Sequence, residues 1–355
     1  MRILIDATPL LLRSAGVKNY TYYWIQGLRQ EADQDQILTF PGMADLPALH
    51  HERSVLGAAR TTAHLGRVFL ANLGALPLLL PRADVFHVSN QVRNPPRNRR
   101  LTATLYDFTV RLMPELHTEA NRKADESLAR NVLQRAAGLI AISEHTRQDA
   151  VRLLGLDPAR IEVIYPGVPE VYFNTKPTAA AKPYVLFVGT IEPRKNVDVL
   201  LDAWRQFRLR NEFDLVIVGP AGWASEKTLA RLQSKPEAVR YLGYLREAEL
   251  PGLTAGATAF VYPSLYEGFG IPVAQAMAAG VPVITSNASC LPEVAGDGAL
   301  LVDPHSPEEI CAALEKLLSS AELRRTLGAA GRAKAQNYRW ELAARKSLEF
   351  FHRLR

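Results

Sequence analysis

The stretch Pro263-Ser264-Leu265-Tyr266-Glu267-Gly268-Phe269-Gly270-Ile271-Pro272 follows a short apolar run, residues 259–262. The run predicts a buried β-strand, and Pro272 predicts the first turn of a helix, where the missing amide hydrogen of proline costs nothing. The glycines on either side of Phe269 allow the backbone to come close to a ligand and to offer amide donors. The stretch therefore predicts a strand, a ligand-binding loop and a helix, which is the repeating unit of a parallel α/β sheet.

Apolar runs of strand length alternate with helical patterns on both sides of this stretch. The predicted strands are residues 3–5, 37–40, 85–87, 102–105, 139–142, 161–164, 184–188, 214–218, 239–242, 259–262, 283–284 and 299–302. The predicted helices include residues 18–30, 120–136, 197–208, 272–279 and 307–319. A break falls at Tyr165-Pro166-Gly167-Val168-Pro169, where two prolines and a glycine follow a strand. We predict an α/β protein of two doubly wound domains joined near residue 170, with ligands bound outside the carboxyl ends of the strands.

The composition limits the class of protein. With 355 residues, 48% of them hydrophobic, the chain can bury two cores of ordinary size and is not disordered. Residues 1–170 hold 20 Lys and Arg against 17 Asp and Glu, and residues 171–355 hold 22 against 19. Each half thus carries a net charge of only +3. Neither half is a basic domain of the kind that would indicate a nucleic-acid partner. The two cysteines form no disulfide framework and the N-terminus lacks a secretory signal pattern, so we expect a cytoplasmic protein.

A second candidate ligand loop follows the predicted strand 184–188. It reads Gly189-Thr190-Ile191-Glu192-Pro193-Arg194-Lys195-Asn196 and leads into a helix. Arg194 and Lys195 place two cations beside the free amide groups of a helix N-terminus, an arrangement that suits a diphosphate. A solvated turn with capping residues is the structural alternative.

The Glu267 carboxylate stands just before the helix predicted at 272–279, where it can accept paired hydrogen bonds from vicinal hydroxyls. Gln275 follows eight positions later, about one and a half turns into that helix. A long ligand could therefore contact Glu267 at one end and Gln275 at the other. A helix cap is the alternative role for Glu267.

Together these motifs resemble the donor-binding domain of the family-4 retaining glycosyltransferases, the group 1 glycosyl transferases of the GT-B fold. The resemblance rests on Glu267-Gly268-Phe269-Gly270, Pro193-Arg194-Lys195-Asn196, Ala279-Gly280-Val281-Pro282 and Gly298-Ala299-Leu300-Leu301-Val302-Asp303-Pro304. It covers nearly the whole chain, more loosely in the first half, and is closest to bacterial mannosyltransferases. It implies two Rossmann-like domains facing across a deep cleft. These would be an acceptor-side domain, residues 1–170 joined by the helix 340–355, and a nucleotide-sugar donor-binding domain, residues 171–339.

The resemblance also implies roles for particular residues. Arg194 and Lys195 would neutralise the donor diphosphate as it leaves, and Glu267 would hold hydroxyls of the donor sugar rather than act as a nucleophile. The other donor-binding positions would be Gly16, Gly189, Thr190, Leu242, Gly243, Tyr244, Gly268, Phe269, Gly270, Ile271 and Gln275. Gly16 lies in a glycine-containing turn, for which a purely structural role is equally open.

Two positions depart from the family pattern. Gln275 stands where relatives usually have Glu, so an amide replaces the charge that would bind the nucleotide ribose. Tyr106-Asp107 follows the predicted strand 102–105, where relatives often have His, and either residue could contact the sugar or the acceptor. His117 is a weaker candidate for an acceptor contact.

No metal and no cofactor is expected beyond the nucleotide-diphosphate sugar as co-substrate. The only Asp-x-Asp, Asp33-Gln34-Asp35, does not follow a predicted strand, and we interpret it as a solvated turn. The expected acceptor is a glycan or a lipid-linked oligosaccharide. The arginines of Arg93-Asn94-Pro95-Pro96-Arg97-Asn98-Arg99-Arg100 either solvate a loop or contact an anionic acceptor or lipid headgroup. The apolar stretch 68–81 is a core helix, or else a helix that lies on a membrane as a peripheral contact.

The expected function is retaining, metal-independent transfer of a hexose, with mannose from GDP-mannose preferred and a UDP-hexose next. Two alternatives stay open: a GT-B sugar-nucleotide epimerase, and a catalytically silent protein that binds a sugar nucleotide.

Overall fold

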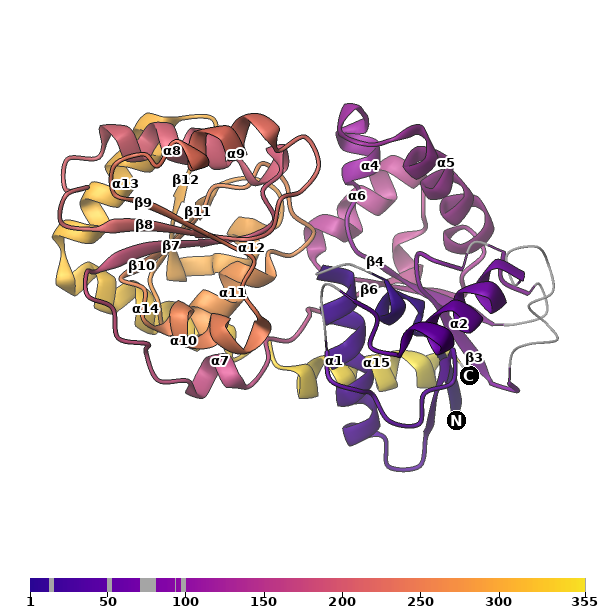
Figure 1. Ribbon diagram of the computed structural model, residues 1–355. Helices are drawn as coiled ribbons and strands as arrows, with labels where there is room; N and C mark the ends of the chain where they lie inside the picture. The colour runs from indigo at the N-terminus through magenta and orange to yellow at the C-terminus, as the bar shows by residue number, and fades with distance from the viewer. Residues whose placement is uncertain (13–15, 50–52, 71–80, 93, 97–99, 355) are drawn as a thin grey trace. The chain divides into compact units, whose positions relative to one another are not determined.

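The computed structural model describes residues 1–12, 16–49, 53–70, 81–92, 94–96 and 100–354. These residues form two compact units (Figure 1). The N-terminal unit comprises Met1–Gly167 and Trp340–Arg355, and the C-terminal unit comprises Val168–Arg339. The chain thus leaves the first unit once and returns to it for the last helix.

The N-terminal unit is built on a six-stranded parallel sheet with the order β2-β1-β3-β4-β5-β6. Its strands are β1 (Arg2–Asp6), β2 (Gln36–Phe40), β3 (Val85–Val88), β4 (Leu101–Leu105), β5 (Gly138–Ala141) and β6 (Ile161–Val163). Its α-helices are α1 (Gly16–Glu31), α2 (Ala58–Leu70), α4 (Thr109–Leu112), α5 (Glu119–Leu128), α6 (Glu144–Leu154) and α15 (Trp340–Arg353). Short turns of other helix types are η1 (Thr8–Leu11), η3 (Pro114–Leu116), η4 (Ala129–Leu133) and η5 (Pro158–Arg160).

Alternate residues of these strands serve two different cores, because side chains along a strand point to opposite faces of the sheet. Leu4, Phe86 and Ala103 belong to an apolar cluster that includes residues of η4 and α6. His87 points to the other face, where its ring lies 4.7 Å from Trp24 of α1 and 5.8 Å from Phe351 of α15 between centroids. The sheet is therefore buried on both faces, as a parallel sheet requires.

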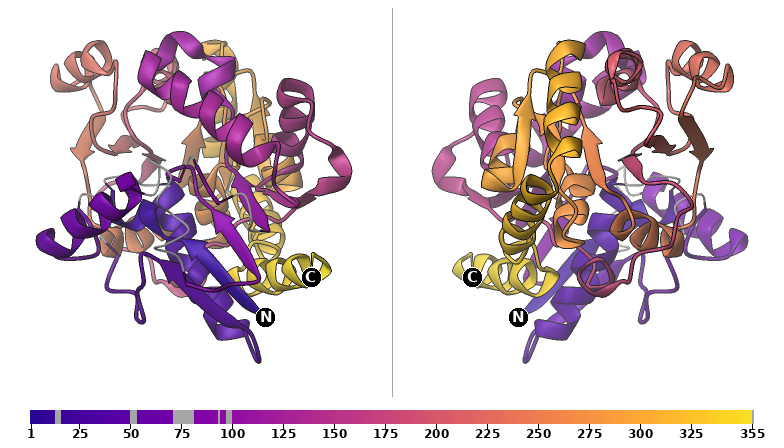
Figure 2. Two further views of the ribbon diagram at one scale, coloured as in Figure 1. Left: turned by 90° about the vertical axis from the view of Figure 1, so that its right-hand side faces the viewer. Right: turned by 90° about the vertical axis from the view of Figure 1, so that its left-hand side faces the viewer.

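The last helix closes the N-terminal unit. α15 packs along α1, and Figure 2 shows the two chain ends beside each other in this unit. Gly167 is needed where the chain first leaves the unit, since a Cβ there would lie 2.4 Å from Cγ of Trp340. None of the helices in the described ranges is long and apolar enough to cross a membrane.

The C-terminal unit contains a second six-stranded parallel sheet, with the order β12-β11-β10-β7-β8-β9. Its strands are β7 (Tyr184–Val188), β8 (Asp214–Val218), β9 (Val239–Gly243), β10 (Ala259–Tyr262), β11 (Val283–Ser286) and β12 (Ala299–Val302). Its α-helices are α7 (Val171–Asn174), α8 (Val197–Gln206), α9 (Glu226–Gln233), α10 (Leu250–Ala255), α11 (Ile271–Ala278), α12 (Leu291–Ala295), α13 (Pro307–Ser319) and α14 (Ala321–Ala335). Its 3-10 turns are η6 (Pro193–Lys195), η7 (Glu247–Glu249) and η8 (Gly296–Gly298).

The strand order of the C-terminal unit is the Rossmann order 3-2-1-4-5-6 when its strands are numbered from β7. The chain winds from β7 through α8 and α9 to β9 and then restarts at β10 on the other side of β7. α8, α9 and α13 cover one face of the sheet, and α10, α11 and α14 cover the other (Figure 1). The strand order reverses between β7 and β10, so the loops after these two strands meet at the topological switch point.

All twelve strands predicted from the sequence are confirmed, as is the two-domain, Rossmann-like α/β fold. One predicted helix, 120–136, is wrong as a single α-helix. It is regular only to Leu128 and continues as a π-helical turn in η4. Val132 and Leu133 in that turn both reach the apolar core, although they are adjacent in sequence. Periodicity alone gives no sign of such a widened turn.

Candidate functional site

The Glu267 carboxylate lies at the switch point of the C-terminal sheet and is surrounded by donors. Oε1 accepts hydrogen bonds from Nζ of Lys195 at 2.6 Å and from the hydroxyls of Ser264 at 2.6 Å and Tyr262 at 3.0 Å. Oε2 lies 2.8 Å from a guanidinium nitrogen of Arg194. The loop after β7 thus supplies both cations, and the end of β10 with its loop supplies the carboxylate and both hydroxyls.

Backbone contacts hold the two loops together. Asn196 adopts a left-handed conformation (φ 61°) between η6 and α8, and its side-chain amide donates to the carbonyls of Pro263 and Pro304. The carbonyl of Arg194 accepts from the amide of Leu265 at 2.9 Å, and its oxygen lies 3.0 Å from the Ser264 hydroxyl oxygen. The positions of the two cations are therefore fixed by the neighbouring strand as well as by their own.

The site is buried, so the pKa of each charged group in it depends on the charges of its neighbours. Burial acts to raise the pKa of Glu267, but the charges of Arg194 and Lys195 outweigh it and lower this pKa to about 2. Burial and the charge of Arg194 lower the pKa of Lys195, against which Glu267 and Glu192 act. Glu192 lies 2.7 Å from the Arg194 guanidinium. Two cations and two carboxylates therefore balance within this cluster.

The glycine-containing loop continues from Glu267 into α11. Gly270 has a φ of 86°, a conformation that favours glycine, and Pro272 lies in the first turn of the helix as predicted. Phe269 is buried against Tyr338, with the two rings edge to face at 5.1 Å. The amide of Glu267 donates to the Ser289 hydroxyl, and the Cys290 thiol donates to the Glu267 carbonyl. The loop is thus fixed from both the sheet and the segment before α12.

Five further predicted positions lie at the same edge of the sheet, at the carboxyl ends of β7 and β9. Gly189 follows β7, and Gly243 ends β9 with a φ of 65°. Gly219, after β8, connects them: its amide donates to the carbonyl of Gly243, and a Cβ on Gly219 would lie 1.8 Å from the carbonyl oxygen of Gly189. Thr190 and Leu242 flank these turns, and Tyr244 is 39% exposed.

Gln275 lies in α11 and is half-buried. Because α11 begins right after the Glu267 loop, the structure places Glu267, Ile271 and Gln275 on one continuous loop and helix. The predicted donor-binding residues of the C-terminal unit thus all gather at one edge of its sheet.

Two family models match the chain. The model "Glycosyl transferases group 1" matches residues 170–334, and the model "Glycosyltransferase Family 4" matches residues 14–171. A D-inositol 3-phosphate glycosyltransferase from a Nocardioides species is 31% identical over 77% of this chain and 68% of its own length. The chain belongs to the group 1 glycosyltransferases.

Other relatives of this glycosyltransferase agree with that assignment. The O-antigen chain mannosyltransferase B of Escherichia coli is 29% identical over 96% of this chain and 97% of its own. The structure of sucrose-phosphate synthase from Thermosynechococcus elongatus superposes with a TM-score of 0.76 at 19% identity, covering 100% and 99% of the two chains. That of HepE from Anabaena with UDP-glucose gives 0.73 at 20% identity, covering 99% and 100%. These structures confirm the GT-B fold.

Three predicted site residues belong to the N-terminal unit of this glycosyltransferase. Tyr106 is half-buried after β4, with its ring edge against Tyr20 at 5.2 Å. Asp107 is exposed and accepts from the amide and the hydroxyl of Thr109, so its carboxylate closes a turn where α4 begins. Gly16 begins α1, and a Cβ there would meet no atom within 4 Å. Contact of these residues with the donor or the acceptor stays a prediction.

The N-terminal unit has its own switch point, between β1 and β3. The Asp6 carboxylate at the end of β1 accepts from the amide and hydroxyl of Thr8 and from the amide and hydroxyl of Ser89, which follows β3. Asp6 is buried and all four donors lie within the protein, so its role is to tie the two strand ends together.

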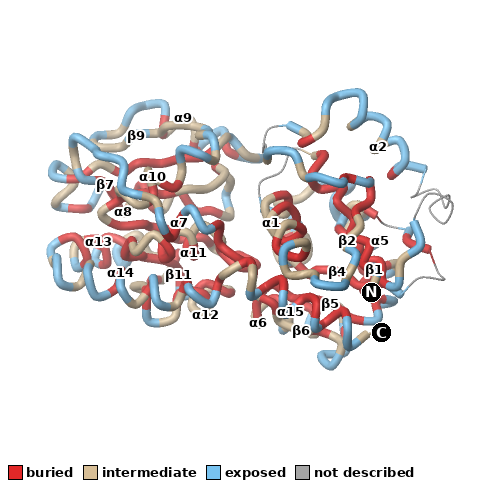
Figure 3. The backbone as a smooth tube through the Cα atoms, turned by 90° about the horizontal axis from the view of Figure 1, so that it is seen from below, coloured by how far each residue is buried: buried red, intermediate tan, exposed pale blue. Residues whose placement is uncertain are grey.

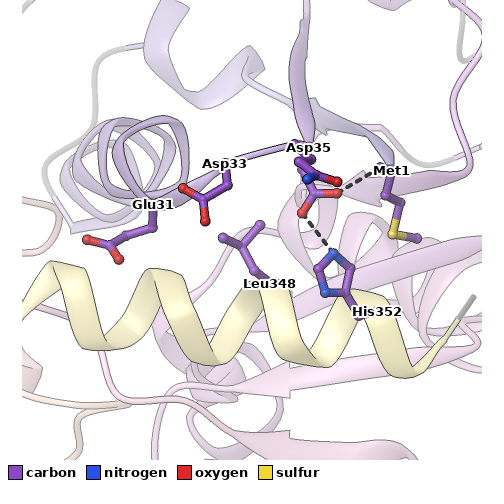
Figure 4. Close-up of a pocket in the computed structure, with 7 residues that line it drawn as sticks. Met1, Glu31, Asp33, Asp35, Leu348 and His352 are labelled. Carbon is purple, nitrogen blue, oxygen red and sulfur yellow. Dashed lines mark hydrogen bonds and ion pairs between the residues drawn. The ribbon is translucent and has the colours of Figure 1, made fainter.

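The Asp-x-Asp sequence belongs to the N-terminal unit, where Asp33 and Asp35 line a pocket beside α15 (Figure 4). Asp33 is exposed, but Asp35 is not the solvated residue that we expected. Its carboxylate binds the amino group of Met1 at 2.7 Å and Nε2 of His352 at 2.8 Å. Within the described ranges no group of His, Cys, Asp and Glu has the geometry to hold a metal ion. Arg93, Arg97 and Arg99 and most of the apolar stretch 68–81 lie outside the described residues.

Sequence reasoning missed three residues of the Glu267 cluster. Tyr262 and Ser264 flank Pro263 in the stretch that decides the fold, yet a strand end with a serine gives no sign of a shared carboxylate. Glu192 stands two positions before Arg194, and its pairing with that residue could have been expected from this spacing. The contacts of Tyr262 and Ser264 with Glu267 lie within one segment, β10 and its loop, and become visible only with the conformation of that loop.

Proposed function

We propose that this glycosyltransferase transfers mannose from GDP-mannose to a glycan or lipid-linked acceptor in surface-polysaccharide assembly. It does so with retention at the anomeric carbon and without a metal ion. The observation that carries the proposal is the placement of Arg194 and Lys195 beside Glu267 at the switch point of the C-terminal sheet. The choice of mannose is supported by the E. coli O-antigen relative, which covers nearly the whole chain.

The proposed role of each site residue follows from its charge and from its position in the cluster. Arg194 and Lys195 hold the diphosphate and stabilise the charge that develops on it as the bond to the sugar breaks. Glu267 lies at the centre of the cluster. Its carboxylate accepts hydrogen bonds from hydroxyl groups of the sugar when the donor binds. Gln275 contacts the nucleotide ribose, and Gly243 and Tyr244 border the base. In other enzymes a divalent cation can stabilise the negative charge of a leaving diphosphate. Here Arg194 and Lys195 supply this stabilisation.

Retention follows a front-face displacement in this proposal. The bond from the anomeric carbon to the phosphate oxygen breaks, and the acceptor oxygen forms its bond from the same face. The acceptor proton passes to the leaving phosphate oxygen. Since Glu267 is held by four donors and its pKa is lowered to about 2, it is a poor proton acceptor, and the proposal gives it no nucleophilic or basic role.

A panel of nucleotide sugars, each incubated with and without mannose-terminated glycans, tests the proposal. We expect nucleotide release that depends on acceptor, is fastest with GDP-mannose and persists in EDTA, with a retained anomeric configuration by NMR. Release that is fastest with a UDP-hexose corrects the donor, and an inverted product refutes the front-face step. Isomerised donor without acceptor indicates an epimerase, and binding without turnover indicates a silent binding protein.

A further inference from the structure

Tyr262 ends β10 with a phenol that is enclosed by the C-terminal unit, and the residue is 0% exposed. Its ring stacks on those of Phe187 and Phe260, with centroids 5.6 and 6.0 Å away, and its carbonyl accepts from the Thr285 hydroxyl at 2.9 Å. Figure 3 shows β7 and β11, the neighbours of β10, largely in the colour of buried residues. This packing fixes the position of the phenolic oxygen.

The phenolic oxygen of Tyr262 lies between a cation and an anion. Nζ of Lys195 is 2.6 Å from it, and Oε1 of Glu267 is 3.0 Å from it. An ammonium group has only donors, so the oxygen accepts from Lys195 and the single phenolic hydrogen is donated to Glu267. Burial and the charge of Glu267 raise the pKa of Tyr262 far above its usual value, so the phenol keeps this hydrogen. The phenol is therefore a neutral link from Lys195 to Glu267.

This hydroxyl limits the directions that the Lys195 ammonium can take. The three ammonium hydrogens rotate freely about the Cε–Nζ bond when only one acceptor holds them. Here two acceptors, the Tyr262 hydroxyl and the Glu267 carboxylate, both lie 2.6 Å from Nζ, which fixes two hydrogens and with them the direction of the third. No acceptor among the described residues binds that third hydrogen. It is the hydrogen that an oxygen of the donor diphosphate can accept.

The hydroxyl also stabilises the charge of Lys195 without cancelling it. The titratable or charged groups around this ammonium are Glu192, Arg194, Tyr262, Glu267 and, against the backbone of Glu267, Cys290. The carboxylates compensate the positive charge, whereas the neutral phenol satisfies one ammonium hydrogen and leaves the charge in place. A hydrogen bond to the charged form of a group favours that form. Loss of the hydroxyl should therefore lower the pKa of Lys195 further.

We propose that Tyr262 is a positioning residue for Lys195, whose ammonium group its hydroxyl directs toward the donor diphosphate and stabilises in the charged state. This inference rests on the proposed function, in which Lys195 binds that diphosphate. The aromatic ring contributes separately, because Nζ lies 5.1 Å from its centroid. Tyr262→Phe keeps the ring and removes only the hydroxyl, so it isolates the proposed role.

Isothermal titration of GDP, and of UDP in parallel, into the full chain between about pH 6 and about pH 9.5 tests the proposal. For Tyr262→Phe we expect the Kd to exceed that of wild type by about two-fold at the acid end, where only the direction of the ammonium is lost, and by about ten-fold at the alkaline end. A fall of about one pH unit in the pKa of Lys195 makes the charged form about ten-fold scarcer at high pH and leaves it unchanged at low pH. Titration of the nucleotide itself cancels in the ratio of the two Kd values.

Tyr184→Phe is the matched control. Tyr184 is a buried tyrosine of the same sheet, and its hydroxyl donates to the Leu253 carbonyl at 2.6 Å. It begins β7, whereas Lys195 follows the carboxyl end of that strand, so the control removes a hydrogen-bonded hydroxyl away from the Glu267 cluster. Tyr184→Phe should bind the nucleotides like wild type at every pH. Thermal unfolding of each variant shows that it is folded.

A double-mutant cycle asks whether Tyr262 acts through Lys195. Lys195→Met should weaken nucleotide binding by about ten-fold or more, and adding Tyr262→Phe to it should change the Kd by less than about two-fold. A Kd ratio for Tyr262→Phe that is the same at every pH, or an equal effect of Tyr262→Phe with and without Lys195, would overturn the role of Tyr262 and leave the proposed function intact. Unchanged nucleotide binding in Lys195→Met would instead overturn the diphosphate contact on which both proposals rest. If Lys195→Met does not fold, the pH series with Tyr262→Phe decides alone.

Discussion

The Lys195 ammonium and the Glu267 carboxylate lie 2.6 Å apart, with the two side chains only 11% and 9% exposed. One residue follows β7 and the other follows β10, so their contact exists only because these strands are neighbours. Each side chain compensates the charge of the other in a buried site, and Arg194 binds the second carboxylate oxygen. The diphosphate-binding cations that we propose are therefore positioned before a donor arrives.

Replacing Glu267 by Gln should impair both the fold and the activity. The change leaves Lys195 and Arg194 buried beside a neutral amide, and breaking a buried ion pair costs about 3–5 kcal/mol. We expect that loss in the free energy of unfolding by chemical denaturation, together with a fall in kcat of at least about 100-fold. Glu226→Gln, an exposed position on α9, is the control and should change neither. A stable Glu267→Gln protein with normal kcat would contradict the role of this carboxylate.

Replacing Glu192 by Gln should tighten the binding of a nucleoside diphosphate. Glu192 neutralises part of the Arg194 charge at 2.7 Å, so removing its charge leaves a net positive cluster. We expect the Kd for GDP to fall by about five- to ten-fold, corresponding to about 1 kcal/mol, and kcat to fall if product release becomes limiting. Isothermal titration measures this Kd. Weaker GDP binding would mean that Glu192 serves instead to orient Arg194, and Arg194→Met tests separately whether Arg194 binds GDP at all.

Replacing Gln275 by Glu should restore the acidic residue that is usual in this family. A carboxylate accepts hydrogen bonds from ribose hydroxyls about twice as strongly as an amide does. We expect the Kd for the nucleotide to fall by about five-fold, with kcat changed less than KM. Gln233→Glu, at the end of α9, is the control for a general effect of added charge. An unchanged or increased Kd would show that Gln275 does not contact the ribose, or that the site has adapted to the amide.

Acidification should destabilise the protein through His87. Its two ring nitrogens lie 3.0 Å from the hydroxyls of Thr102 and Thr104, and burial lowers its pKa from 6.5 to about 3. The unfolded chain therefore binds this proton first, so the stability is complete above pH 6.5 and is lost as the pH falls from 6.5 toward 3. The loss amounts to about 4 kcal/mol at the lower limit. His87→Gln, which does not titrate, should show a flatter profile of unfolding free energy against pH, and an identical profile would exclude this role.

Replacing Gly219 by Ala should disrupt the turns that carry the predicted donor-binding residues. Gly219 has a φ of 152°, and its new Cβ would lie 1.8 Å from the Gly189 carbonyl oxygen. We expect a loss of about 3 kcal/mol in unfolding free energy and weaker nucleotide binding. Gly57→Ala is the control, because a Cβ there meets nothing within 4 Å, and it should be neutral or slightly stabilising. A fully stable Gly219→Ala protein would mean that the turn can move away at little cost.

The sequence by itself determined the strands, the two α/β domains and the family. Strand positions follow from runs of apolar residues bounded by glycine and proline, and such runs are local, so pairing is not needed to find them. The same holds for the motifs around Arg194 and Glu267, because each is a contiguous loop between a strand and a helix. The local pattern did not predict the π-helical turn at 129–133 or the pairing of Asp35 with Met1 and His352.

Only the tertiary structure decided which residues share the site. The order of strands places β7 beside β10, and this adjacency brings Lys195, separated from Glu267 by 72 positions, to within 2.6 Å of it. The folded loop after β10 adds Tyr262 and Ser264, which no sequence pattern singles out. Such contacts depend on how separate elements pack, and the free energy of burying charges together exists only after they have packed.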